Sequence, residues 1–157
     1  MKNLFRTLAL LLVAISAASL TSCSEDSNDS KYQSKFPQFS DITTTPTTVT
    51  AGDSVTFTAV QSTYGNLLYG ATYTWTFGDQ TGTSSVVYDN DKSNPTFKTV
   101  APTTSGTYTV QLKATYNVSG RQATAPAATT QSGFSVTYSS SSMQYDITVS
   151  KRIVVVN

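Results

Sequence analysis

The sequence contains no histidine, a single cysteine and a single glutamate, and only 12% of its 157 residues are charged. Because histidine is absent, the chain lacks the commonest proton shuttle and metal ligand of enzymes. Its aspartates fall in predicted turns or at strand edges, and it has neither a glycine-rich phosphate loop nor a Gly-x-Ser-x-Gly motif. The sequence therefore predicts a protein that is not an enzyme, with no catalytic residues, no metal site and no bound cofactor.

The chain also lacks an excess of either sign of charge, since it has ten basic and nine acidic residues. Scattered lysines on a nearly neutral surface do not attract nucleic acid, which is not an expected partner. No segment after residue 22 keeps an apolar period of 3.6 residues over three helical turns. Threonine, serine, tyrosine, valine and phenylalanine dominate there and often alternate, which predicts an all-β domain.

The start of the chain has a different character. Lys2 and Arg6 flank the start of an apolar run from Leu8 to Leu20. A helix needs about 20 apolar residues to cross a bilayer core of about 30 Å, so this run is too short to span. The arrangement predicts a signal peptide over residues 1–22.

The signal ends in Leu20-Thr21-Ser22-Cys23, which resembles the lipobox of bacterial lipoproteins. The resemblance implies cleavage before Cys23 and acylation of its thiol, so that a covalent lipid anchors the mature protein to a membrane. More than one acyl chain is needed for stable anchoring, and the diacyl or triacyl cysteine of this family meets that condition. The alternative is a soluble secreted protein with one idle thiol.

The residues after Cys23 form a predicted flexible tether, 23–38. In the lipoprotein family Ser24 argues against retention in the inner membrane, and the acidic run from Glu25 to Asp29 resembles the surface-export signal of Bacteroidetes lipoproteins. We therefore expect a lipid-anchored outer-membrane protein exposed on the cell surface. A plain solvated spacer is the alternative explanation of the acidic run.

Residues 39–157 predict one domain. The clearest strand has apolar residues at alternate positions from Tyr108 to Tyr116, and similar alternation marks 55–60 and 73–77. Weaker strands are predicted around Ile42 and at 84–88, 95–100, 134–138 and 145–156. Seven to eight short strands indicate a two-sheet β-sandwich, with a barrel as second choice.

Three segments resemble the landmarks of PKD domains, which are immunoglobulin-like sandwiches. They are Trp75-Thr76-Phe77-Gly78-Asp79, Asn94-Pro95-Thr96-Phe97 and Gly106-Thr107-Tyr108-Thr109-Val110-Gln111-Leu112. The resemblance implies a module for adhesion, spacing or contact with carbohydrate or protein. The sequence departs from the family at Gln80, at Val100-Ala101-Pro102 and in an insertion at 117–132.

Several residues invite a functional interpretation and a structural one. Trp75 is a candidate for stacking on a sugar, but its phase with Tyr73 and Phe77 favours the core. Asp79 is a candidate metal ligand, but a carboxylate after a glycine favours a turn. The segment 89–94 alternates oxygen donors as a calcium loop does, but it lacks the glycine and glutamate of that loop and favours a polar hairpin connection.

The best candidate binding residues lie in the segment 61–71, predicted as a loop between the second and third strands. Its four large apolar side chains either fold back over the core or contact a partner. An immunoglobulin-like topology places this loop and the insertion at one end of the sandwich, beside the tether. The predicted binding edge comprises Tyr64, Leu67, Leu68, Tyr69, Arg121 and Gln122.

The expected function is a non-catalytic binding module for a glycan or a neighbouring outer-membrane protein. The alternative is a structural spacer or fimbria-like assembly subunit, in which the apolar final strand 153–156 pairs with another chain by strand addition.

Overall fold

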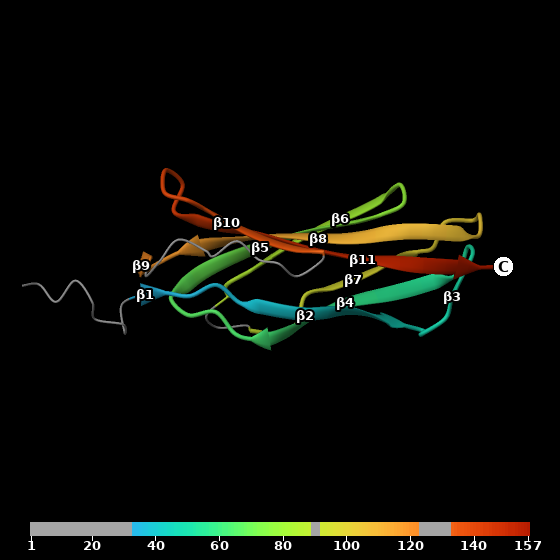
Figure 1. The fold of residues 1–157 in the computed structure, drawn as a ribbon, viewed down its shortest axis with the longest axis horizontal. Coiled ribbons are helices and arrows are strands. Elements are labelled where there is room, and N and C mark those ends of the chain that lie inside the picture. Colours follow the sequence, from blue (N-terminus) through green and yellow to red (C-terminus); the bar gives the residue numbers. More distant parts are fainter. Residues whose placement is uncertain (1–32, 89–91, 123–132) are drawn as a thin grey trace, which may run out of the picture.

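The computed structural model describes residues 33–88, 92–122 and 133–157. Within these ranges the chain forms strands and turns, and no helix is long and apolar enough to span a membrane. Two sheets lie face to face as an elongated sandwich (Figure 1). The predicted all-β, immunoglobulin-like fold is confirmed.

The larger sheet has the strand order β10-β11-β8-β5-β6, and β3 adds to the far part of β11. These strands span Phe134–Ser139 (β10), Gln144–Val156 (β11), Gly106–Val118 (β8), Leu68–Phe77 (β5), Gln80–Val86 (β6) and Val49–Thr50 (β3). The ladders between β10, β11, β8, β5 and β6 are antiparallel, whereas β3 runs parallel to β11.

The smaller sheet has the order β2-β4-β7, formed by Gln38–Thr45, Ser54–Thr63 and Thr96–Val100. Two residues at the start of the fold, Gln33–Ser34 (β1), pair in parallel with Arg121–Gln122 (β9). Eight of the described strands have five or more residues, as the sequence pattern predicts.

Alternation along the strands produces the core. In β8 the residues Val110, Leu112, Ala114 and Tyr116 are fully buried, and the positions between them face outward. Their neighbours on β5 include Tyr73 and Trp75, whose predicted burial is confirmed, since Trp75 is 1% exposed. A period of two residues on each strand therefore gives one buried face between the two sheets.

Some predicted boundaries were wrong. Two strands are longer than the hydrophobic alternation in the sequence predicts: β4 continues to Thr63, and β5 begins at Leu68. Only residues 64–67 connect these strands, rather than the predicted loop 61–71. On the edge strand, β6 runs from Gln80 to Val86 instead of 84–88. At the start, residues 33–38 were assigned to the tether, yet they hold β1, the buried Ser34 and the first residue of β2.

The final strand lies inside the larger sheet. Along most of its length β11 pairs with β8, and at Val155 and Val156 its other edge pairs with β3. Strand addition at Val155 and Val156 would require β3 to leave. At Ile153 and Val154 the same edge pairs with no described strand, so the strand-addition alternative stays a prediction.

One ion pair crosses between the sheets. Lys151 occupies an inward phase of β11 between Val149 and Ile153, and its Nζ donates hydrogen bonds of 2.8 Å to both carboxylate oxygens of Asp41 and to the carbonyl of Ile42. Both side chains of the ion pair are 40–48% exposed, so solvent weakens their attraction. The bridge closes the β2–β11 side of the sandwich.

The opposite side is closed by an aromatic ring. Phe97 of β7 stacks on Trp75 and Phe57, with ring centroids 6.1 and 6.5 Å away. It also lies against Gly82 of β6, where an added Cβ would overlap the Phe97 ring. The absence of a side chain at residue 82 lets the two sheets approach at this edge.

We expect Gly82→Ala to lower the free energy of unfolding by about 1–3 kcal/mol, because the methyl group must displace the Phe97 ring. Chemical denaturation of the parent and the variant measures this change. Gly106→Ala is the matched control, since a Cβ there meets only Tyr108 at an ordinary 3.5 Å. An equal effect of both substitutions would contradict the packing role of Gly82.

Candidate binding surface

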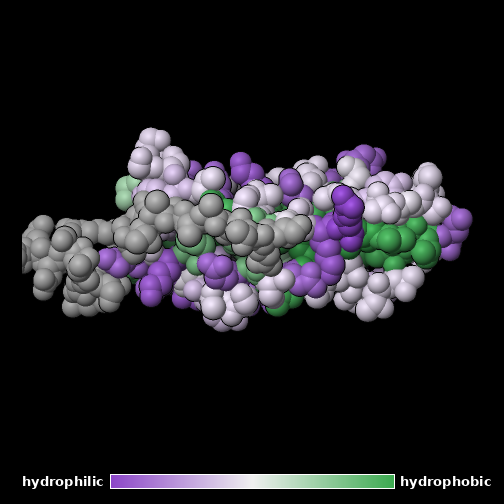
Figure 2. Space-filling model, viewed as in Figure 1, coloured by the Kyte–Doolittle hydropathy of each residue, from purple (hydrophilic) through white to green (hydrophobic). Residues whose placement is uncertain are grey.

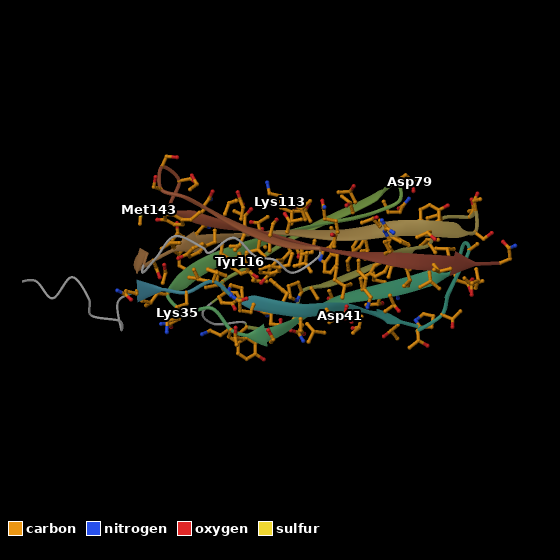
Figure 3. The ribbon with its side chains drawn as sticks, viewed as in Figure 1. Lys35, Asp41, Asp79, Lys113, Tyr116 and Met143 are labelled. Carbon is orange, nitrogen blue, oxygen red and sulfur yellow. The ribbon has the colours of Figure 1, made fainter. Side chains whose placement is uncertain are left out.

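The connection 64–67 is held between two segments that are distant in sequence. Lys35 and Asn66 exchange backbone hydrogen bonds of 3.0 and 2.9 Å, and the amide of Ser119 donates to the carbonyl of Leu67 at 2.9 Å. The start of the described chain, this connection and the end of β8 thus meet at one end of the sandwich, where Figure 3 labels Lys35. We call this the β1 end.

A buried polar network fixes the same connection from beneath. The Tyr88 hydroxyl donates to Gln61 Oε1 at 2.8 Å and accepts the amide of Gly65 at 2.8 Å. The Gln61 side-chain amide donates to the carbonyls of Ser93 and Lys92, and its backbone amide donates to Asn94 Oδ1. The polar segment after residue 91 therefore braces the connection. It leads from β6 of the larger sheet to β7 of the smaller one, so the predicted hairpin is corrected to a crossover between the sheets, and residues 89–91 of the calcium-like segment lie outside the described residues.

One of the two leucines of the predicted binding edge belongs to the core. Leu68 is completely buried as the first residue of β5, and Leu67 is half-buried with a positive φ of 54°. The assignment of Leu68 to a binding surface is therefore corrected, since no ligand reaches it in the folded chain. Of the two open interpretations of this segment, the fold-back applies to Leu68.

The two tyrosines of the edge are exposed but occupy different places. Tyr64 is 60% exposed and lines an open depression of about 420 Å³, and Tyr69 is 58% exposed but is not one of the lining residues. We call this the Tyr64 depression, and its walls come from β1, β2, β4, β11 and the residues beside them. It is lined by Ser34, Lys35, Phe36, Gln38, Thr63, Tyr64 and Tyr145.

Tyr145, a residue of β11 in the larger sheet, lines one side of this depression. Its ring centroid lies 5.3 Å from Phe36 and 5.1 Å from Tyr138. Its hydroxyl donates to the carbonyl of Ser34 at 3.4 Å and shares a 3.2 Å hydrogen bond with the Ser34 hydroxyl. Burial raises the pKa of Tyr145, so the hydroxyl keeps its proton, and remains a donor, to a higher pH than a solvent-exposed tyrosine does.

Arg121 and Gln122 are also brought to the β1 end, since their backbones pair with Gln33 and Ser34. Their side chains and residues 123–132 lie outside what the structure describes. Residues 117–118 of the expected insertion belong instead to β8, where Asn117 Oδ1 accepts the Gln144 side-chain amide at 2.8 Å.

The sequence offered little signal for the residues that complete the depression. Phe36, Lys35 and Ser34 stood in the assigned tether, and Tyr145 appeared as an ordinary position of a final strand. The one available signal was the apolar Phe36-Pro37 pair within an otherwise polar segment. A long-range contact between residues 34 and 145 has no local sequence signature.

Other surfaces present less. Asp79 lies at the opposite end from Lys35 in Figure 3, and its carboxylate accepts only the Gln80 side chain among the described groups. The described residues hold no group of three possible metal ligands. A second depression, lined by Thr109, Gly133, Ser150, Lys151 and Arg152, has no aromatic side chain.

An apolar area lies near the C-terminal end of β11 (Figure 2), the strand that exposes 63% of Val154 and 39% of Val156. Neither valine is among the residues that line the two depressions described above. The Tyr64 depression is thus the site at which exposed aromatic and polar groups converge.

We expect Tyr145→Phe to reduce stability by about 1 kcal/mol, because it removes the hydrogen bonds to Ser34 and leaves the ring contacts in place. Faster amide hydrogen exchange at residues 34–36 would accompany the change. Tyr138→Phe is the control, since the Tyr138 hydroxyl has no hydrogen bond within the described residues. Unchanged exchange at residues 34–36 would contradict this account.

Comparison with protein families agrees with this architecture. The PKD domain model matches residues 41–129, more than half of the chain and the stretch that holds Trp75, Phe97 and the start of β8. No curated protein and no solved structure matches the chain. PKD domains are generally non-catalytic immunoglobulin-like modules. The chain belongs to the PKD domain family.

Proposed function

We propose that this protein is a surface lipoprotein of the outer membrane, anchored through Cys23, whose PKD domain is a non-catalytic module that binds a glycan in the Tyr64 depression. The observation that carries the proposal is the exposed Tyr64 ring at the rim of a depression with two further aromatic side chains, Phe36 and Tyr145. A neighbouring surface protein is the other partner that this end of the domain suits.

The side chains of the depression match the two faces of a sugar. A sugar ring presents an apolar C–H face that covers an aromatic side chain, while its hydroxyls need directional partners. Lys35, Gln38 and Thr63 line the same depression and offer an ammonium, an amide and a hydroxyl. A volume of about 420 Å³ lies within the range of small-ligand sites.

The same groups do not favour hydrolysis of the bound sugar. Glycosidases use a pair of carboxyl groups that flank the scissile bond. The seven lining residues include no carboxylate. These residues can form hydrogen bonds with a sugar and stack against it, which supports a binding role.

The position of the depression restricts where its ligand is found. Residues 23–32 separate the proposed lipid anchor from β1, and ten extended residues reach at most about 35 Å. A lipidated Cys23 therefore keeps the depression close to the membrane surface. A glycan of the cell envelope, or one handled by an outer-membrane protein, is the ligand that this placement favours.

A structural role is the second candidate. The open edge of β6, at the end of the larger sheet, favours an assembly function. It does not compete with glycan binding, because it uses a different edge of the domain.

We expect Cys23→Ser to abolish incorporation of labelled palmitate and to release the protein from the membrane fraction, because serine offers no thiol for acylation. Metabolic labelling followed by fractionation measures both effects. Ser22→Ala is a control that leaves the thiol in place. Persistent labelling of Cys23→Ser would contradict the proposed anchor.

We expect Tyr64→Ala to weaken binding to immobilised polysaccharide from the producing cell's own envelope by about tenfold or more, because the stacking ring is lost. Binding isotherms for the membrane-extracted protein measure the change. Tyr69→Ala is a matched control with a similarly exposed ring outside the depression, and should change affinity less than about twofold. Equal losses in both variants would rule out the depression as the site.

A further inference from the structure

We infer that two copies of this chain pair edge to edge through β6, which joins their larger sheets into one continuous sheet across a two-fold axis. The inference goes beyond glycan binding and does not depend on it. It rests on the hydrogen-bonding pattern of β6, on its sequence and on the contrast with the edge strands of the smaller sheet.

Within the described residues β6 pairs with one strand only. Its ladder with β5 runs from Ala71↔Val86 to Phe77↔Gln80 without a register shift. The strand order of the larger sheet ends at β6, so its second edge has no partner strand. In Figure 1 β6 lies along the outside of the sandwich.

The turn determines which backbone groups are free. Gly78 and Asp79 form a two-residue turn, and in such hairpins the residues that close the turn, here Phe77 and Gln80, are a hydrogen-bonded pair. Alternation then directs the backbone of Gln80, Gly82, Ser84 and Val86 toward β5. The N–H and C=O groups of Thr81, Thr83 and Ser85 point to the open edge.

The sequence of β6 is complementary to itself in one antiparallel register. With Thr83 opposite Thr83 of the second copy, Thr81 stands opposite Ser85 and Gln80 opposite Val86. All six outward backbone groups of each copy then find a partner. The facing side chains are small hydroxyl residues, all three of them exposed in the single chain, and no like charges oppose each other.

The two edge strands of the smaller sheet carry devices that oppose such pairing. On β2, Asp41 sits at a register shift and engages Lys151. On β7, Lys98 is present and Pro95 precedes the strand. Charged residues, proline and bulges are the usual protection of an edge strand, and β6 has none of the three.

The two-fold axis fixes the arrangement of the pair. Antiparallel pairing of β6 places the two β1 ends at opposite ends of the joined sheet. Two copies anchored in one membrane would therefore lie with their long axes parallel to its surface. Both Tyr64 depressions then remain near the membrane, one at each end.

Oxidative cross-linking of the full-length protein in its own membrane tests the inference. Hydrogen-bonded antiparallel partners have Cα atoms about 5.5 Å apart, which suits a disulfide. We expect Thr83→Cys to give a disulfide-linked dimer on a non-reducing gel. Thr109→Cys, which lies on the outer face of β8 away from the edge, should give no more dimer than the parent chain, whose one thiol is Cys23.

The register is tested separately. Thr81→Cys combined with Ser85→Cys in one chain should cross-link, whereas each single substitution should not, because residue 81 of one copy faces residue 85 of the other. Absence of a Thr83→Cys dimer, or equal dimer from Thr109→Cys, would overturn the inference. Cross-linking of the single Thr81→Cys variant equal to that of the double variant would overturn the proposed register.

Discussion

The ladder between β8 and β11 is the interaction on which the rest of the structure depends. Twelve consecutive residue pairs join the two strands, from Asn117↔Gln144 to Gly106↔Val155, without a register shift. With no second cysteine in the chain, no internal disulfide is available. The register of this ladder must therefore be held by packing, because a slip of one residue would turn every buried side chain outward.

The binding surface is an extension of this core. Tyr116 and Tyr145 are partners across the ladder, and burial raises the pKa of both hydroxyls. Tyr116 packs against Tyr73 and Tyr88 within the sandwich. Tyr145, at the end of the ladder, holds Ser34 and supports Phe36 instead. Of these two neighbouring tyrosines, Tyr116 lies in the core and Tyr145 lines the depression. The contacts of Tyr145 hold residues 34–36, at the start of the described chain, beside the depression.

The connection at residues 64–67 obeys a second constraint. Gln61 and Ser34 are buried polar residues of the described chain, and the side-chain amide of Gln61 is satisfied by Tyr88, Ser93 and Lys92. A buried amide without such partners would cost about 1–3 kcal/mol. These contacts hold the connection in one conformation and keep Tyr64 at the rim of the depression rather than within the core.

Much of the fold follows from the sequence, because alternation is a local signal. The strands that hold Trp75, Phe97 and Leu112 were predicted from their own residues, and the family landmarks gave the sandwich. The limits of the strands were less well predicted, since Leu68 joins β5 through its pairing with Val118 rather than through any preference of its own.

The candidate site was only partly predictable. Tyr64 was one of four large apolar residues in the glycine-bearing loop predicted at 61–71, and the sequence did not separate it from Tyr69 or from the buried Leu68. Lys35 is held near Tyr64 by its backbone hydrogen bonds to Asn66. Phe36 is held there by its ring contact with Tyr145, which lies more than one hundred residues further along the chain. Contacts of that range depend on topology, which a single sequence does not encode locally.

The most direct test of the account is photo-cross-linking in intact cells, with a photoreactive phenylalanine analogue at position 64 and, in a separate strain, at position 69. The account predicts a cross-linked product at position 64, with either a glycan or an outer-membrane protein, and little or none at position 69. Equal products at both positions, or none at position 64 while the protein is present on the cell surface, would contradict a binding surface at the β1 end.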